Sequence, residues 1–159
     1  MGISRLFLIC PDCHLEVPIN REFGDHSFYL TALGTAFDLS EFEFMEEVNQ
    51  LVIKEDIKEI ILVNDHQCTF VKSALQNEVR YNTKAEKILL KIAENSSDVQ
   101  NIQNDVLKST QISKINLKRL AKDLIESAFI GNKIEEGVIT LNGAIYNRDD
   151  NSFQETSVF

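Results

Sequence analysis

Two runs of aliphatic residues, each followed by a short polar segment that contains cysteine, constrain the fold of this chain most strongly. Residues 6–9 precede Cys-Pro-Asp-Cys-His at 10–14, and residues 60–63 precede Asn-Asp-His-Gln-Cys at 64–68. Continuous aliphatic runs of this length are typical of strands buried on both faces of a parallel sheet. The carboxyl ends of such strands open on one edge, where α/β folds bind ligands, so we expect the two polar segments to meet there.

The remaining pattern predicts a three-layer α/β fold with a mostly parallel β-sheet flanked by helices. Amphipathic helical segments alternate with aliphatic runs, an order that favours parallel pairing. At 159 residues the chain has the size of one ordinary domain, so we expect a single domain over 1–159. Strands are expected at 5–9, 28–33, 59–63 and 138–146, helices from 40, 69, 83 and 116, loops or short helical turns at 15–29, and a polar turn at 147–151.

Helix starts are indicated by capping residues. Ser40 with Glu43 and Thr83 with Glu86 have the spacing of a capping box, and Asn116 is expected to cap a late helix. The polar stretch 93–114 allows a weak surface helix or a partly mobile segment, and its thin apolar stripe favours the helix.

The acidic charge balance disfavours two classes of partner. With 16 basic and 25 acidic side chains and a net charge of −9, the chain lacks the excess of cations that nucleic acid and anionic membranes require. Neither a membrane-spanning apolar run nor the pattern of a signal peptide is present, so we expect a cytoplasmic protein. An odd number of cysteines, three, fits a reducing compartment, where clustered thiols bind metal or do chemistry.

The two polar segments carry the side chains of a zinc site. Cys10 and Cys68 can supply two thiolates, and Asp65 or His66 a third ligand. The fourth position is open to water, Asp12, Cys13 or His14. Two other interpretations remain: the cysteines are ordinary buried residues, or Cys10 and Cys13 form a dithiol redox pair.

The same residues resemble the signatures of the β-class carbonic anhydrases. The family's first signature, Cys-x-Asp-x-Arg at a strand end, compares with Cys10 and Asp12, and His14 stands in the arginine place. Its second, His-x-x-Cys-Gly, compares with the segment that ends at Cys68 and Thr69. Residues 137–147 are similar to the family's last strand, and 31–35 stand in for its Arg-Asn-Ala-Gly loop.

The resemblance implies a zinc enzyme, a carbonate dehydratase, that reversibly hydrates carbon dioxide to bicarbonate. By this comparison Cys10 and Cys68 are metal ligands, and Asp12 with His14 handles the proton. The family spacing places the third ligand at Asp65, while His66, the available imidazole, is one residue closer to Cys68. The resemblance also implies a homodimer or higher homo-oligomer.

Departures from the signatures favour a second class of function on the same scaffold. His14 is mostly neutral at pH 7 and lacks the guanidinium fork of arginine, so the clamp on Asp12 differs from that of the family. A non-catalytic zinc-binding or regulatory protein is the alternative. Under the family alignment, Cys68→Ser abolishes metal binding whereas Cys13→Ser spares it.

Overall fold

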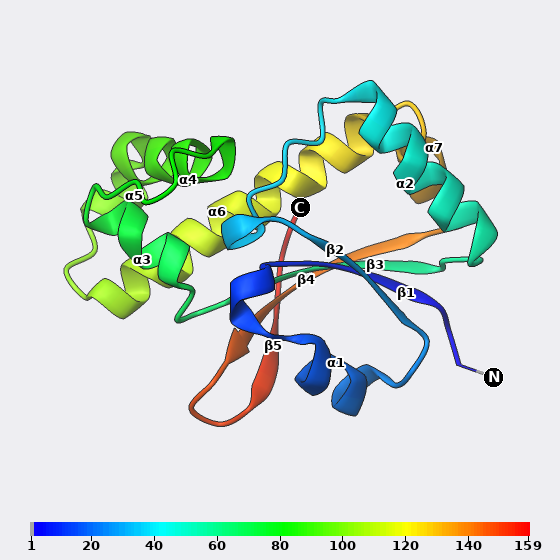
Figure 1. Ribbon diagram of the computed structural model, residues 1–159, viewed down its shortest axis with the longest axis horizontal. Coiled ribbons are helices and arrows are strands. Elements are labelled where there is room, and N and C mark those ends of the chain that lie inside the picture. The colour runs from blue at the N-terminus through cyan, green and yellow to red at the C-terminus, as the bar shows by residue number, and fades with distance from the viewer. Residues whose placement is uncertain (1) are drawn as a thin grey trace.

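A five-stranded, mostly parallel sheet forms the centre of the molecule (Figure 1). The computed structural model describes residues 2–159. In sheet order β2-β1-β3-β4-β5 the first four strands are parallel, and β5 runs antiparallel to β4. The strands are β1 (Arg5–Ile9), β2 (Ser27–Thr31), β3 (Glu59–Asp65), β4 (Thr140–Asn147) and β5 (Ser152–Thr156). The predicted parallel sheet is confirmed, and β5 is an addition that the sequence pattern did not predict.

Both faces of the sheet are buried, which explains why the central strands are aliphatic throughout. Leu8 pairs with Leu62 in the parallel register of β1 and β3, and both side chains enter one hydrophobic cluster. Phe7 and Ile61, one residue earlier in each strand, enter a second cluster on the opposite face. Successive side chains of a strand point to opposite faces, so a run without polar residues needs a cover on both sides.

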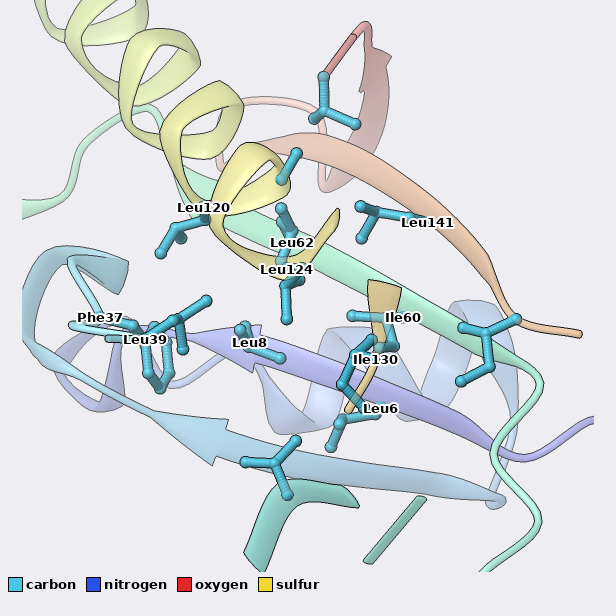
Figure 2. Close-up of a cluster of buried hydrophobic side chains, with 14 of the residues drawn as sticks. Leu6, Leu8, Phe37, Leu39, Ile60, Leu62, Leu120, Leu124, Ile130 and Leu141 are labelled. Atoms are coloured by element: carbon cyan, nitrogen blue, oxygen red, sulfur yellow. The ribbon is translucent and has the colours of Figure 1, made fainter. Parts of the chain in front are cut away.

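Helices provide that cover. They are α1 (Glu16–Phe23), α2 (Phe42–Lys54), α3 (Thr69–Leu75), α4 (Lys84–Asn95), α5 (Ser97–Gln100), α6 (Asp105–Glu126) and α7 (Gly131–Glu135). In Figure 1, α2 and α7 lie on the opposite side of the sheet from α1, while α3, α4 and α5 gather around the first half of α6. Figure 2 shows Leu120 and Leu124 of α6 over Leu8 and Leu62 of the sheet. The predicted three-layer architecture is therefore confirmed.

Of the three helix starts predicted from capping residues, two differ from the structure, whereas the helix expected from 69 is confirmed as α3. Asn104 caps α6, accepting the N–H groups of Val106 at 2.9 Å and Leu107 at 3.1 Å. Asn116 thus lies inside a long helix, fully buried, and the prediction that it caps one is wrong. α6 also contains the second half of the polar stretch 93–114, so the helix favoured there is confirmed from Asp105 onward.

The predicted capping box at Ser40 is also absent. α2 begins at Phe42, and its N-cap residue is Glu41, which makes no side-chain cap; the Ser40 hydroxyl donates instead to Asp38 at 2.6 Å. The capping box of α4 is confirmed: Thr83 Oγ1 accepts the Glu86 N–H at 3.2 Å, and the Glu86 carboxylate accepts the Thr83 N–H at 2.8 Å. Within residues 2–159, no helix is both long and apolar enough to cross a membrane.

Candidate metal centre

The three cysteines meet at the carboxyl end of the parallel strands. Their Sγ atoms all lie within 4.8 Å of one another, and all three side chains are buried. Cys10 directly follows β1, and Cys68 follows β3, the neighbouring strand. Pro11 opens a 3₁₀ turn, η1 (Pro11–Cys13), in which the Cys13 N–H donates to the Cys10 carbonyl at 3.2 Å and turns Cys13 back toward Cys10. The expected convergence of the two polar segments is therefore present.

The thiol cluster, as we call Cys10, Cys13 and Cys68, has dimensions that suit a thiolate metal site. Tetrahedral zinc with Zn–S bonds of about 2.3 Å separates its sulfur ligands by about 3.8 Å. Sulfur atoms within 4.8 Å of one another need only a small adjustment to reach that separation. Their chemistry agrees as well, because thiolate is a preferred zinc ligand.

Hydrogen bonds within the thiol cluster concentrate negative charge on Cys10. The thiols of Cys13 and Cys68 donate to Cys10 and lower its pKa to about 3, against the opposing effect of burial. The same bonds, together with burial, raise the pKa of Cys13, and they raise the pKa of Cys68 to about 12. A cation bound by all three sulfur atoms would replace the thiol protons that form these hydrogen bonds.

A backbone donor completes the environment of Cys10. Gly34, in the 3₁₀ turn η2 (Leu33–Thr35), donates its N–H to Cys10 Sγ at 3.1 Å. Its φ of +62° is in the left-handed region, and a Cβ atom there would lie 2.4 Å from Cδ1 of Leu89. Glycine is thus the residue that lets this loop approach the thiolate so closely.

Asp65, the residue at the family's histidine position, does not join the thiol cluster. Its side chain is fully buried at the end of β3, and its Oδ1 accepts the Gln67 N–H at 2.7 Å. Its Oδ2 forms an ion pair with Nε of Arg148. Oδ1 is thus hydrogen-bonded, whereas Oδ2 accepts no hydrogen bond within residues 2–159 and has the charge of Arg148 as its partner.

His66 is likewise engaged away from the sulfur atoms. Its Nδ1 lies 3.1 Å from the Tyr146 carbonyl oxygen and 3.4 Å from the Arg148 backbone nitrogen. Nε2 lies 3.4 Å from the Gln67 amide and 3.6 Å from Asp149. Both ring nitrogens thus have partners other than the thiol cluster, two of them around the turn between β4 and β5.

Asp12 and His14 lie on the exposed side of η1. The Thr69 hydroxyl donates to Asp12 Oδ2 at 2.8 Å. Thr69 replaces the family's glycine, and its hydroxyl supplies a partner for Asp12 in a chain whose arginine place holds His14. His14 itself is exposed and adopts a left-handed backbone with φ of 52°.

Two residues of this centre were not predicted as its components. Cys13 was considered for the fourth position or for a redox pair with Cys10, and not as one of the main ligands, although its Cys-x-x-Cys spacing and the turn-forming Pro11 were visible signals. Arg148 lies in a segment expected to be an ordinary turn, and nothing in the local sequence indicates its pairing with Asp65, 83 positions earlier. The predicted roles of Asp12, His14, Asp65 and His66 stay predictions.

Comparison with solved structures identifies the fold. No protein-family model and no curated protein matches the sequence. Among solved structures, the β-carbonic anhydrase CafA of Aspergillus fumigatus superposes with a TM-score of 0.82 at 14% identity, covering 100% of this chain and 77% of that one. A structure of two tetrameric β-carbonic anhydrases from Sordaria macrospora gives 0.81 at 16% identity, with 99% and 82% covered. The β-carbonic anhydrase of Coccomyxa, in complex with acetazolamide, gives 0.75 at 13% identity, with 98% and 72% covered. The resemblance seen in the sequence is thus confirmed at the level of fold: this chain has the β-carbonic anhydrase fold.

Proposed function

We propose that this chain is a metal-binding protein that holds zinc through the thiolates of Cys10, Cys13 and Cys68. The observation that carries the proposal is the meeting of all three buried thiols within 4.8 Å. A cluster of this kind satisfies the ligand chemistry of zinc, and the solved structures compared above that share the fold are β-carbonic anhydrases. The metal ligands of the family alignment, Cys10 and Cys68 with Asp65 or His66, are the competing set.

Reversible hydration of carbon dioxide is the second candidate, and the position of Asp12 favours it. When bound, zinc makes hydroxide available near neutral pH. Asp12 lies one residue from Cys13 on the exposed side of the centre, where its carboxylate can accept a proton while Thr69 orients it. His14, exposed two residues further on, can pass that proton to solvent. The non-catalytic zinc protein differs from the enzyme only in lacking this step.

Dithiol redox chemistry through Cys10 and Cys13 is less well supported. Thiol exchange requires a partner sulfur to reach the attacking thiolate. Cys10 is 0% exposed and Cys13 is 3% exposed. The redox interpretation also leaves the third thiol, on Cys68, without a role.

Elemental analysis of protein purified without chelator or affinity tag tests the proposal. Near one zinc per chain is expected for the native protein, with loss in Cys10→Ser, Cys13→Ser and Cys68→Ser. Asp65→Asn is the matched control, because it changes the competing ligand and keeps the side-chain shape. Metal retained in Cys13→Ser but lost in Asp65→Asn would establish the ligand set of the family alignment. No zinc in the native chain would end the proposal.

A hydration assay on the same samples separates the enzyme from the binder. Stopped-flow hydration by the zinc-loaded native chain, above that of zinc-free Cys10→Ser, supports catalysis, and Asp12→Asn should then lower the rate. Zinc without hydration would leave the non-catalytic function.

Self-association is a further part of the proposal. The Sordaria macrospora proteins with this fold are tetrameric, and we propose a homo-oligomer for this chain, acting as one domain over 1–159. Light scattering after size exclusion measures the assembly directly. A monomer at working concentration would contradict this part without affecting the metal site.

A further inference from the structure

Arg148 links the buried carboxylate of Asp65 to the backbone of the thiol cluster. Its Nε forms an ion pair with Asp65 Oδ2, and its Nη2 donates to the Cys13 carbonyl. The Arg148 side chain is 42% exposed, whereas that of Asp65 is 0% exposed. An arginine on the turn between β4 and β5 thus reaches inward across the edge of the sheet to two segments of the site.

This contact decides which ligand atoms are available to a cation. Asp65 Oδ1 is already bound by the Gln67 N–H, so Oδ2 is the oxygen that could turn to a metal, and Arg148 occupies it. The imidazole of His66 is bonded to the Tyr146 carbonyl. The three sulfur atoms are the remaining buried ligands, and the exposed carboxylate of Asp12 accepts a hydrogen bond from the Thr69 hydroxyl.

The softness of the available ligand atoms determines which metal ions the site prefers. Soft thiolates favour thiophilic ions such as Cu⁺ and Cd²⁺, while oxygen ligands favour harder ions. Zinc is borderline and commonly completes four ligands with nitrogen or oxygen. A site restricted to three sulfur atoms therefore suits a thiophilic ion better than the same site with an added carboxylate.

We infer that Arg148 sets the metal preference of the thiol cluster: by holding Asp65 it withholds the oxygen ligand and favours thiophilic cations relative to zinc. The inference rests on the proposed function, that the cluster binds metal. Arg148 acts as a positioning residue, since it controls the ligand without touching the cation. The ion pair also keeps a fourth negative charge from adding to those of three thiolates.

Competition between Cd²⁺ and Zn²⁺ tests this role. The quantity measured is the ratio of their two dissociation constants, obtained by chelator competition for the native chain and Arg148→Met. Release of Asp65 should lower the preference for Cd²⁺ about tenfold, the lower end of what outer partners of metal ligands usually contribute. Cobalt as a spectroscopic substitute for zinc should show three thiolates in the native chain, with a shifted ligand-field band in Arg148→Met.

Two variants separate an effect of Arg148 that acts through Asp65 from a general disturbance of the metal site. Asp65→Asn should leave the native ratio unchanged, because the free guanidinium affects both divalent ions alike. Adding Asp65→Asn to Arg148→Met should restore the native ratio, since no carboxylate is then released. An unchanged ratio in Arg148→Met, or equal ratios in the single and double variants, would overturn the inference.

If Arg148→Met does not fold, Arg148→Gln tests the same release of Asp65, and Asp65→Asn provides an independent check. Asp65→Asn replaces a side chain by one of the same shape and keeps Arg148 in place. A change in the Cd²⁺ to Zn²⁺ ratio in that variant would show Asp65 to be a ligand in the native site and refute the inference. Native chain that binds neither cation would refute the proposed function, and the inference with it, whereas binding with the wrong ratios refutes the inference alone.

Discussion

Replacing Gly34 by alanine should destabilise the chain through two separable effects. Gly34 has φ of +62°, and a left-handed backbone costs an alanine about 1–2 kcal/mol. The new methyl would also lie 2.4 Å from Leu89 Cδ1 and 3.3 Å from Phe70 Cβ. Leu89 is 0% exposed and packed within a hydrophobic cluster, so the methyl group must displace it, and overpacking of this kind costs about 1–3 kcal/mol. The free energy of unfolding should therefore fall by about 2–5 kcal/mol.

Gly137 provides the matched control, because it separates backbone strain from packing. Its φ is +72°, yet a Cβ atom there would meet nothing within 4 Å. Gly137→Ala should thus cost only the backbone share, about 1–2 kcal/mol. Urea denaturation of both variants measures the difference, and each kcal/mol lowers Tm by about 2–4 °C in a chain of this size. Equal destabilisation by the two substitutions would refute the packing argument and show that Leu89 moves aside freely.

Three further predictions concern polar groups. Burial raises the pKa of Glu86, but hydrogen bonds from Thr83, Tyr81 and Arg80 outweigh it and lower this pKa to about 2, below the usual 4.5. Acid titration followed by circular dichroism should therefore show a stability contribution that is complete above about pH 5 and lost as the pH falls toward 2, and Glu86→Gln should lack this dependence. Asn116→Ala should lower the free energy of unfolding by about 1–3 kcal/mol in urea, because the Asn116 amide donates to the buried Thr35 carbonyl at 3.0 Å; a neutral result would mean that water replaces it. Arg148→Met should lower the free energy of unfolding by about 1–3 kcal/mol in urea, because it leaves the buried Asp65 carboxylate without its cation; a neutral result would argue that the ion pair does not stabilise the fold.

The central sheet was predictable because its signal is local. Aliphatic runs at β1 and β3 reflect burial on both faces, and the pairing of the two strands follows from parallel topology. β5 was missed since Ser152–Thr156 forms an edge strand with one apolar residue and no aliphatic run. Its place in the sheet depends on pairing with β4, which supplies the register that its own sequence does not indicate.

The roles of residues with distant partners could not be predicted from local sequence patterns. Asn116 has the composition of a helix cap, and only its contact with Thr35, 81 positions away, explains an asparagine inside a buried helix. The convergence of Cys10 and Cys68 followed from strand order, whereas the inward turn of Cys13 depends on the geometry of η1. Local spacing predicts which groups reach one edge of the sheet, and side-chain direction then decides which of them touch.

The position of Arg148 in the chain gives the site an order of assembly. Cys10, Cys13, Asp65 and Cys68 all lie within the first 68 residues, whereas Arg148 is synthesised 80 residues later. Synthesis at about 5–20 residues per second separates these events by several seconds at least. A growing chain can thus pair β1 with β3 and bring the thiols together while Asp65 still lacks its cation. During that interval Asp65 has no Arg148 to pair with, so under the proposed metal binding a nascent chain would offer a cation an oxygen ligand that the finished protein withholds.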